Sequence, residues 1–258
     1  IMPTVHGVWM KYVVMSVASY ATLYILAPPR VDVALLEDAE GLPFHKHCLL
    51  SLLAYSTVLN GFIAGMFRAE VGMEMLGKDE TTGQVPLWSY IIFAGFHFPT
   101  WLYTALQATK DGTVGISVAD EVAPGFWLGG RYGNELGRTW DGIIDLTCEF
   151  PERSKGATDD AYLLLRCWDG VPPTPDQLEC AAAFAVKKHS KKGGGILVHC
   201  AHGRGRSTTV MCACLVKAGL YKNWEEAFEA CQAKRKVVQL NSKMRRALTA
   251  WQEMQCKK

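Results

Sequence analysis

Residues 199–207 read His-Cys-Ala-His-Gly-Arg-Gly-Arg-Ser, and this short run constrains the chain more than any other feature. An apolar, strand-like run precedes it at 196–198, and a helix-like stretch follows at 208–217. A junction from strand to helix gathers backbone N–H groups and the positive end of a helix dipole. The sequence therefore predicts a cysteine that faces an anion-binding loop.

The residue types in this loop suit attack on a phosphate ester. A free thiol has a pKa near about 8.5, and cations at a helix N-terminus lower it by several units, so we expect Cys200 to be a thiolate. Gly203 and Gly205 allow the loop to turn with its amides inward. Arg206 offers a planar fork for two phosphate oxygens. The alternative is a buried structural cysteine, but the combined pattern favours a nucleophile.

The run resembles the signature loop of the cysteine-based protein tyrosine phosphatases, most closely in their dual-specificity branch, and the resemblance covers residues 117–256. The family pattern of His-Cys, five residues, Arg and Ser or Thr falls on His199, Cys200, Arg206 and Ser207. We expect Ser207 to donate to the sulfur when the phosphocysteine breaks down, and His199 to stabilise the thiolate. The expected phosphate-binding residues are Ala201, His202, Gly203, Arg204, Gly205 and Arg206.

A carboxylic acid must also protonate the leaving oxygen. In the family this acid is an aspartate on a mobile loop upstream of the cysteine, and Asp169 fits that place, after a strand-like run and before a helix near 175–176. The alternative is that Asp169 is an ordinary turn residue before a glycine. Asp159 and Asp160 are rivals, but they precede the strand, where an acid would point away from Cys200.

Three apolar runs mark the N-terminal part of the chain: Val8–Ala27, Cys48–Phe67 and Leu87–Ala108. Each is long enough, at about 30 Å as a helix, to cross a bilayer core. We therefore expect residues 1–110 to form an all-α transmembrane region of about three spans. A buried helical domain is the alternative, above all for the second run. The chain begins with Ile1 rather than methionine, so the expected number of spans allows for others that precede residue 1.

Residues 117–256 alternate between short strands and helices, which predicts an α/β domain with a mainly parallel central sheet flanked by helices. The expected strands are 126–128, 142–147, 162–166 and 196–199, and the expected helices are 176–189, 224–234 and 242–255. Residues 111–125 read as a linker that runs into the first strand. A helix is expected to end near residue 140.

The nine cysteines show no C-x2-C pair, so we expect neither a disulfide framework nor a zinc site. The reaction needs no metal or organic cofactor. The net charge of +2 and the scattered lysines indicate solvated surface rather than a nucleic-acid partner. Because a reactive thiolate needs a reducing solvent, the catalytic half should face the cytosol or an equivalent compartment.

The predicted function is a membrane-anchored phosphatase that hydrolyses phosphate monoesters through a phosphocysteine, with phosphotyrosine, phosphoserine or phosphothreonine in proteins as substrate. A phospholipid or phosphoinositide phosphatase is one alternative, favoured by the membrane region and the cations His202 and Arg204. Ala201 counts against it, since lipid-directed relatives carry lysine there. A non-catalytic, membrane-anchored phosphate-binding module is the other alternative.

Overall fold

The computed structural model describes residues 7–27, 43–113, 117–189 and 193–256, with the backbone alone at 107–113. The chain divides into two compact units, Gly7–Val71 and a second unit that begins at Gly72. Composition suggested a boundary near residue 110, whereas the two compact units divide earlier in the chain, between Val71 and Gly72. The start of the chain, on which the expectation of further spans depends, lies outside the described residues.

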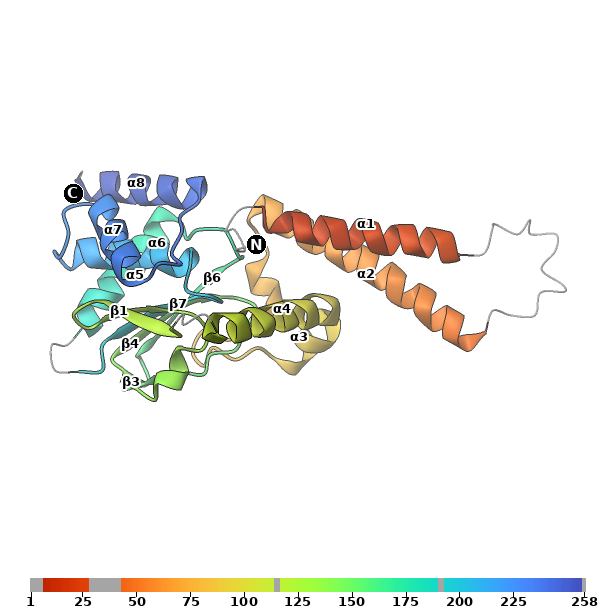
Figure 1. The fold of residues 1–258 in the computed structure, drawn as a ribbon, viewed down its shortest axis with the longest axis horizontal. Helices are drawn as coiled ribbons and strands as arrows, with labels where there is room; N and C mark the ends of the chain where they lie inside the picture. The colour runs from red at the N-terminus through yellow and green to blue at the C-terminus, as the bar shows by residue number, and fades with distance from the viewer. Residues whose placement is uncertain (1–6, 28–42, 114–116, 190–192, 257–258) are drawn as a thin grey trace. The chain divides into compact units, whose positions relative to one another are not determined.

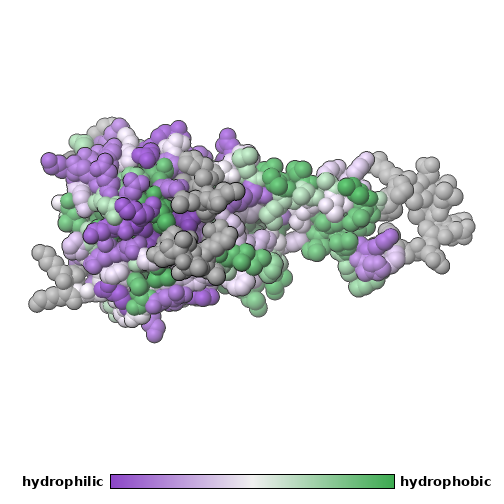
Figure 2. All heavy atoms as spheres, viewed as in Figure 1, coloured by the Kyte–Doolittle hydropathy of each residue, from purple (hydrophilic) through white to green (hydrophobic). Residues whose placement is uncertain are grey.

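The first unit is a hairpin of two helices, α1 (Trp9–Leu26) and α2 (Phe44–Ala69) (Figure 1). The hydroxyl of Ser16 donates to the carbonyl of Thr57 at 2.8 Å, and a Cβ on Gly61 would lie 3.2 Å from the same hydroxyl, so small residues let the helices approach closely. Apolar side chains cover the outward faces (Figure 2). Among the described helices, α2 is the one long and apolar enough to cross a bilayer.

The second unit is built on a five-stranded sheet of order β1-β2-β7-β4-β6. Its strands are β1 (Ala119–Ala123), β2 (Phe126–Gly129), β7 (Ile196–His199), β4 (Gly142–Thr147) and β6 (Tyr162–Cys167). The β1–β2 pair is antiparallel, and the other pairs are parallel. The expected mainly parallel sheet is therefore confirmed. A second, two-stranded sheet pairs β3 (Thr139–Trp140) with β5 (Lys155–Gly156).

The two central strands, β4 and β7, are buried on both faces, including their polar residues Asp145 and His199. Ile144 and Val198 belong to the main core, whereas Ile143 and Leu197 belong to a smaller cluster on the opposite face. Four helices supply the main core: α5 (Pro175–Lys188), α6 (Arg206–Lys217), α7 (Trp224–Lys234) and α8 (Ser242–Cys256). They gather over one face of the sheet (Figure 1).

Two local predictions differ from the structure. The linker expected at 111–125 contains β1, an edge strand whose charged residues Asp120 and Glu121 hide its strand character from a hydrophobicity pattern. The helix end expected near residue 140 is instead a 3₁₀ turn, η3 (Gly133–Leu136), followed by β3.

The third apolar run belongs to the second unit rather than to the helical hairpin. It forms α3 (Leu87–Ile92) and α4 (Ala94–Thr113), interrupted at Phe93. Phe96 is buried, and its ring meets that of Trp168 edge-on at 5.8 Å. Some apolar side chains of the third run therefore pack within the second unit. A 3₁₀ turn, η2 (Met73–Leu76), precedes α3 in this unit.

Candidate active site

The signature loop joins β7, the middle strand of the sheet, to the N-terminus of α6. Gly203 has a φ of 68°, and a Cβ there would lie 2.5 Å from the carbonyl carbon of Gly129. Only glycine meets both conditions. Gly205 has a φ of −117°, so its backbone does not require the freedom that the sequence suggested. The loop geometry therefore depends on the first of the two glycines.

Arg235 turns the carbonyls of this loop outward. Its guanidinium donates from Nε to the carbonyl of Gly203 at 2.9 Å and from Nη2 to that of His202 at 3.2 Å. Nη1 of the same side chain binds Asp120 on β1 at 2.7 Å. A peptide whose carbonyl faces outward presents the neighbouring amide to the inside, as an anion-binding loop needs.

The sulfur of Cys200 accepts from the amides of Arg204 and Ser207, and the residue is 4 % exposed. Its Sγ is 3.3 Å from Oγ of Ser207. Burial alone would raise the pKa of Cys200, but the guanidinium of Arg206, the hydroxyl and amide of Ser207 and the amide of Arg204 lower it overall. The structure thus brings together the cysteine, arginine and serine that the sequence predicted, and it favours the thiolate.

The guanidinium of Arg206 is fully buried and tightly held. Nη2 donates to Oε1 of Glu149 at 2.8 Å, and Nη1 donates to the carbonyl of Cys167 at 2.8 Å and to that of Leu146 at 3.1 Å. Burial by itself lowers the pKa of Arg206, but Glu149, Asp169 and the thiolate raise it well above its usual value. The positive charge next to the sulfur is therefore permanent.

Asp169 lies in the turn after β6, and its side chain is 39 % exposed. One carboxylate oxygen is 3.4 Å from Nη2 of Arg206, so the acid stands at the same edge of the sheet as the signature loop. The rivals lie elsewhere: Asp160 pairs with Lys188 at 2.6 Å, and Asp159 is exposed. The geometry separates the three aspartates and brings only Asp169 to the site.

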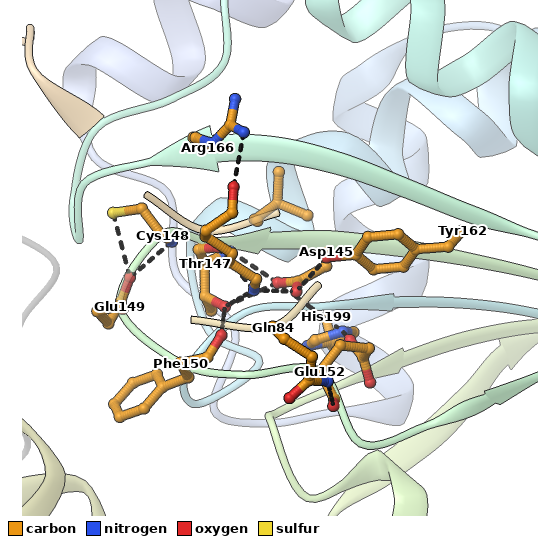
Figure 3. Close-up of polar contacts among 12 residues, drawn as sticks. Gln84, Asp145, Thr147, Cys148, Glu149, Phe150, Glu152, Tyr162, Arg166 and His199 are labelled. Atoms are coloured by element: carbon orange, nitrogen blue, oxygen red, sulfur yellow. Dashed lines mark hydrogen bonds and ion pairs between the residues drawn. The ribbon is translucent and has the colours of Figure 1, made fainter. Parts of the chain in front are cut away.

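His199 faces two buried carboxylates on the side of the sheet opposite α5–α8. Its Nε2 is 2.5 Å from Oε2 of Glu152 and 3.9 Å from Oδ1 of Asp145, and Figure 3 shows these side chains converging. Burial alone would lower the pKa of His199, but the two carboxylates raise it to about 9. His199, the residue before Cys200, is therefore an imidazolium at neutral pH.

Asp145, Glu152 and His199 offer three ligand atoms within 4.8 Å of one another, the one such group among the described residues. The ammonium of Lys78, however, binds Asp145 and also reaches the carbonyl of Thr147 at 2.9 Å. A resident cation thus already contacts one of the carboxylates that a metal ion would need.

The remaining loop residues occupy different environments. His202 is half-buried, and the ring of Tyr103 from α4 meets it edge-on at 6.3 Å. Arg204 is only 8 % exposed, so it adds little positive charge at the surface. Ala201 is buried, and its carbonyl accepts from the amide of Arg131 at 3.3 Å.

Five residues of this site were missed by sequence reasoning: Lys78, Asp145, Glu149, Glu152 and Arg235. Glu149 had a usable signal, because it follows a buried strand whose carboxyl end must meet that of β7 in a parallel sheet. Lys78 and Arg235 carried none, since each is distant in sequence from the loop and stands among other charged residues.

Comparison with known proteins agrees with this geometry. Residues 173–254 match the family model described as "Dual specificity phosphatase, catalytic domain". No curated protein matches the sequence.

Several solved structures are similar. A single-residue variant of human DUSP28 is 22 % identical, with 55 % of this chain and 99 % of that chain covered and a TM-score of 0.47. A mouse putative dual specificity phosphatase complexed with zinc tungstate is 25 % identical, with coverage of 54 % and 90 % and a TM-score of 0.46. PTPMT1 in complex with PI(5)P is 20 % identical, with coverage of 55 % and 99 % and a TM-score of 0.43.

The family match begins after β6 and takes in loop 199–207 and helices α5–α8. Residues 173–254 therefore match the dual-specificity phosphatase catalytic domain, a cysteine-dependent phosphatase domain, over the segment that carries Cys200 and Arg206.

Proposed function

We propose that the chain is a membrane-anchored phosphatase that hydrolyses phosphate monoesters through a phosphocysteine formed on Cys200. The observation that carries the proposal is the convergence on one sheet edge of three groups: a thiol of lowered pKa, a permanently charged arginine, and a half-exposed aspartate 3.4 Å from that arginine. A phosphate held by the loop amides and Arg206 would have its phosphorus in front of the sulfur.

The proposed reaction has two steps. The thiolate of Cys200 attacks phosphorus, the P–O bond to the leaving group breaks, and Asp169 gives its proton to the departing oxygen. Water, deprotonated by the same carboxylate, then attacks the phosphocysteine, and the sulfur leaves as a thiolate stabilised by Ser207. Nε of Arg206 has no protein acceptor among the described residues, which supports its use for a phosphate oxygen.

Phosphorylated tyrosine, serine or threonine in proteins is the proposed substrate. A phosphate in a lipid headgroup is the second candidate, and one observation favours it. Exposed apolar side chains of α3 and α4, among them Ile91, Phe98 and Trp101, lie on the helices that bring Tyr103 against His202. An apolar surface beside a phosphate site would suit a substrate embedded in a bilayer.

For the domain organisation, we propose that the α1–α2 hairpin is the membrane anchor and that the catalytic unit begins at Gly72 rather than near residue 117. The length and composition of α2 support the anchor, and the buried contacts of η2, α3 and α4 within the second unit support the boundary. The lowered pKa of Cys200 favours a reducing compartment for the catalytic unit.

The test is phosphate release by the full chain in detergent micelles or vesicles. We expect turnover of a phosphotyrosine peptide by the wild type and none by Cys200→Ser, with Cys180→Ser, a change at an exposed cysteine, as the matched control. Full activity of Cys200→Ser would refute the mechanism.

Vesicles that contain a phosphoinositide separate the two substrate classes. Faster release from peptide than from vesicles supports the protein substrate. Faster release from vesicles than from peptide would establish the lipid as substrate. In that case Trp101→Glu should abolish release from vesicles while a soluble aryl phosphate is still hydrolysed.

A further inference from the structure

Lys78 is buried to 1 % exposure, far from the signature loop in sequence, and all three donors of its ammonium are engaged. They reach Asp145, the carbonyl of Thr147 at 2.9 Å and the hydroxyl of Thr147 at 3.0 Å. Burying an ammonium is costly unless it is paired and fully hydrogen-bonded. The contacts of Lys78 offset that cost, and they connect it to residues that surround the active site.

Asp145 connects this lysine to the catalytic strand. It lies on β4 directly opposite His199 on β7 in the parallel register. Its Oδ1 is 3.9 Å from Nε2 of His199, and its Oδ2 accepts from the hydroxyl of Tyr162 at 3.0 Å (Figure 3). The ammonium of Lys78 thus fixes one of the two carboxylates that face the residue before the nucleophile.

The turn that follows Lys78 binds the backbone of Glu152, the residue that bears the second carboxylate. The carbonyl of Gly83 accepts from the amide of Glu152 at 2.9 Å, and Nε2 of Gln84 donates to the carbonyl of Glu152 at 2.9 Å. The turn is itself closed by Asp79, whose carboxylate accepts from the amides of Thr81 and Thr82. Residues 78–84 therefore contact both Asp145 and Glu152, the two acidic partners of His199.

The charges in this cluster balance. Lys78 and the imidazolium of His199 stand against Asp145 and Glu152, and the hydroxyl of Tyr162 donates to Asp145. Arg166 lies at the edge of the cluster, where it donates to the carbonyl of Lys78 at 2.7 Å and its charge is paired with Glu80. Loss of one cation leaves an excess negative charge beside the peptide that carries the sulfur, which disfavours the thiolate.

We propose that Lys78 is a positioning residue of the active site: its ammonium holds the Asp145–His199–Glu152 cluster that sets the charge next to Cys200. Residues 78–84 are then part of the catalytic machinery although they precede the family match by almost a hundred residues. The inference rests on the proposed function, since it concerns the same nucleophile.

The test measures the alkylation rate of Cys200 by iodoacetamide against pH, in the full chain in detergent, with the modified peptide followed by mass spectrometry. We expect Lys78→Met to move the midpoint upward by about one pH unit. Lys78→Arg and the double variant Lys78→Met/Asp145→Asn, which keep the charges balanced, should stay near the wild type. Lys188→Met removes a lysine of the surface pair with Asp160 and is the control.

A folded Lys78→Met protein with the wild-type midpoint and wild-type kcat/KM would overturn the proposal, since a purely structural lysine would leave the thiol midpoint where it was. If Lys78→Met does not fold, Asp145→Asn decides instead: a downward shift supports the cluster, and no shift overturns it. Because alkylation uses no substrate, a failure of the proposed phosphatase function would be seen separately, as absent turnover in a wild type whose Cys200 still titrates low.

Discussion

The carboxylate of Glu149 accepts hydrogen bonds from both terminal nitrogens of Arg206, from Nη2 to Oε1 at 2.8 Å and from Nη1 to Oε2 at 3.3 Å. The two side chains are buried, and the paired fork has one orientation that satisfies both oxygens. Glu149 therefore sets the direction in which the remaining N–H of the guanidinium points, and it does so from a strand end that the family match does not include.

Glu149→Gln should lower kcat/KM for a phosphotyrosine peptide by about 10- to 100-fold, the range expected when a charge-assisted hydrogen bond is weakened. The loss should fall on both kcat and KM, because Arg206 binds the phosphate in the ground state and in the transition state. Steady-state kinetics check this, with Glu179→Gln on α5, where the carboxylate binds Lys217, as the matched control. Unchanged kinetics would show that Arg206 keeps its orientation without Glu149.

Asp169→Asn should slow the hydrolysis of esters with poor leaving groups by about 100-fold or more, since the departing oxygen then receives no proton. Activated aryl phosphates should lose much less. A series of aryl phosphates of graded leaving-group pKa measures the difference, and Asp160→Asn, in the surface pair with Lys188, serves as control. An equal loss across the series would remove Asp169 from the role of acid.

Gly203→Ala should abolish phosphate binding, whereas Gly219→Ala should not affect it. Both glycines have positive φ, 68° and 73°, but a Cβ at Gly203 meets the Gly129 backbone at 2.5 Å, and one at Gly219 meets open space. The control should therefore lose only about 1–2 kcal/mol of stability from backbone strain. Vanadate binding together with thermal unfolding separates the two effects, and a Gly203→Ala protein that binds vanadate normally would contradict the account of the loop.

Two buried histidines should shape the pH dependence of stability in opposite ways. Burial lowers the pKa of His97 to about 4 from 6.5, so the unfolded chain binds the extra proton first, and stability should fall as the pH drops from 6.5 toward 4. The pKa of His199 is raised to about 9, so its contribution should be complete below pH 6.5 and lost as the pH rises toward 9.

His97→Gln should flatten the acid limb by up to about 3 kcal/mol and leave the alkaline limb unchanged. Denaturant unfolding in detergent at a series of pH values measures both limbs. An acid limb that is as steep in the variant as in the wild type would assign the loss of stability to other groups.

The parts of the site that lie close together in sequence could be predicted from it. Cys200, Arg206 and Ser207 are joined by one loop, and the strand and helix on either side fix where that loop stands. Asp169 followed because it directly succeeds a recognisable strand at the same sheet edge. Local pattern indicated where these residues lie, and the resemblance to the phosphatase family supplied the roles expected of them.

The partners that the chain brings from far away could not be found in this way. Lys78 reaches Asp145 across 67 positions, and no periodicity marks a lysine as buried. The third apolar run shows the same limit. Its sequence suggested one long apolar helix, but the run is divided into α3 and α4, and Phe96 packs against Trp168 inside the unit. Hydropathy alone does not distinguish lipid from a protein core.

The order of the strands places Cys200 and Asp169 at two differently supported parts of the sheet. Cys200 follows β7, which has a parallel neighbour on each side, whereas Asp169 lies just after β6, which has a neighbour on one side only in this sheet. Amides of the outer strand open more readily to solvent than those at the centre. Hydrogen–deuterium exchange should therefore be slower in the amides of β7, next to Cys200, than in those of β6, next to Asp169.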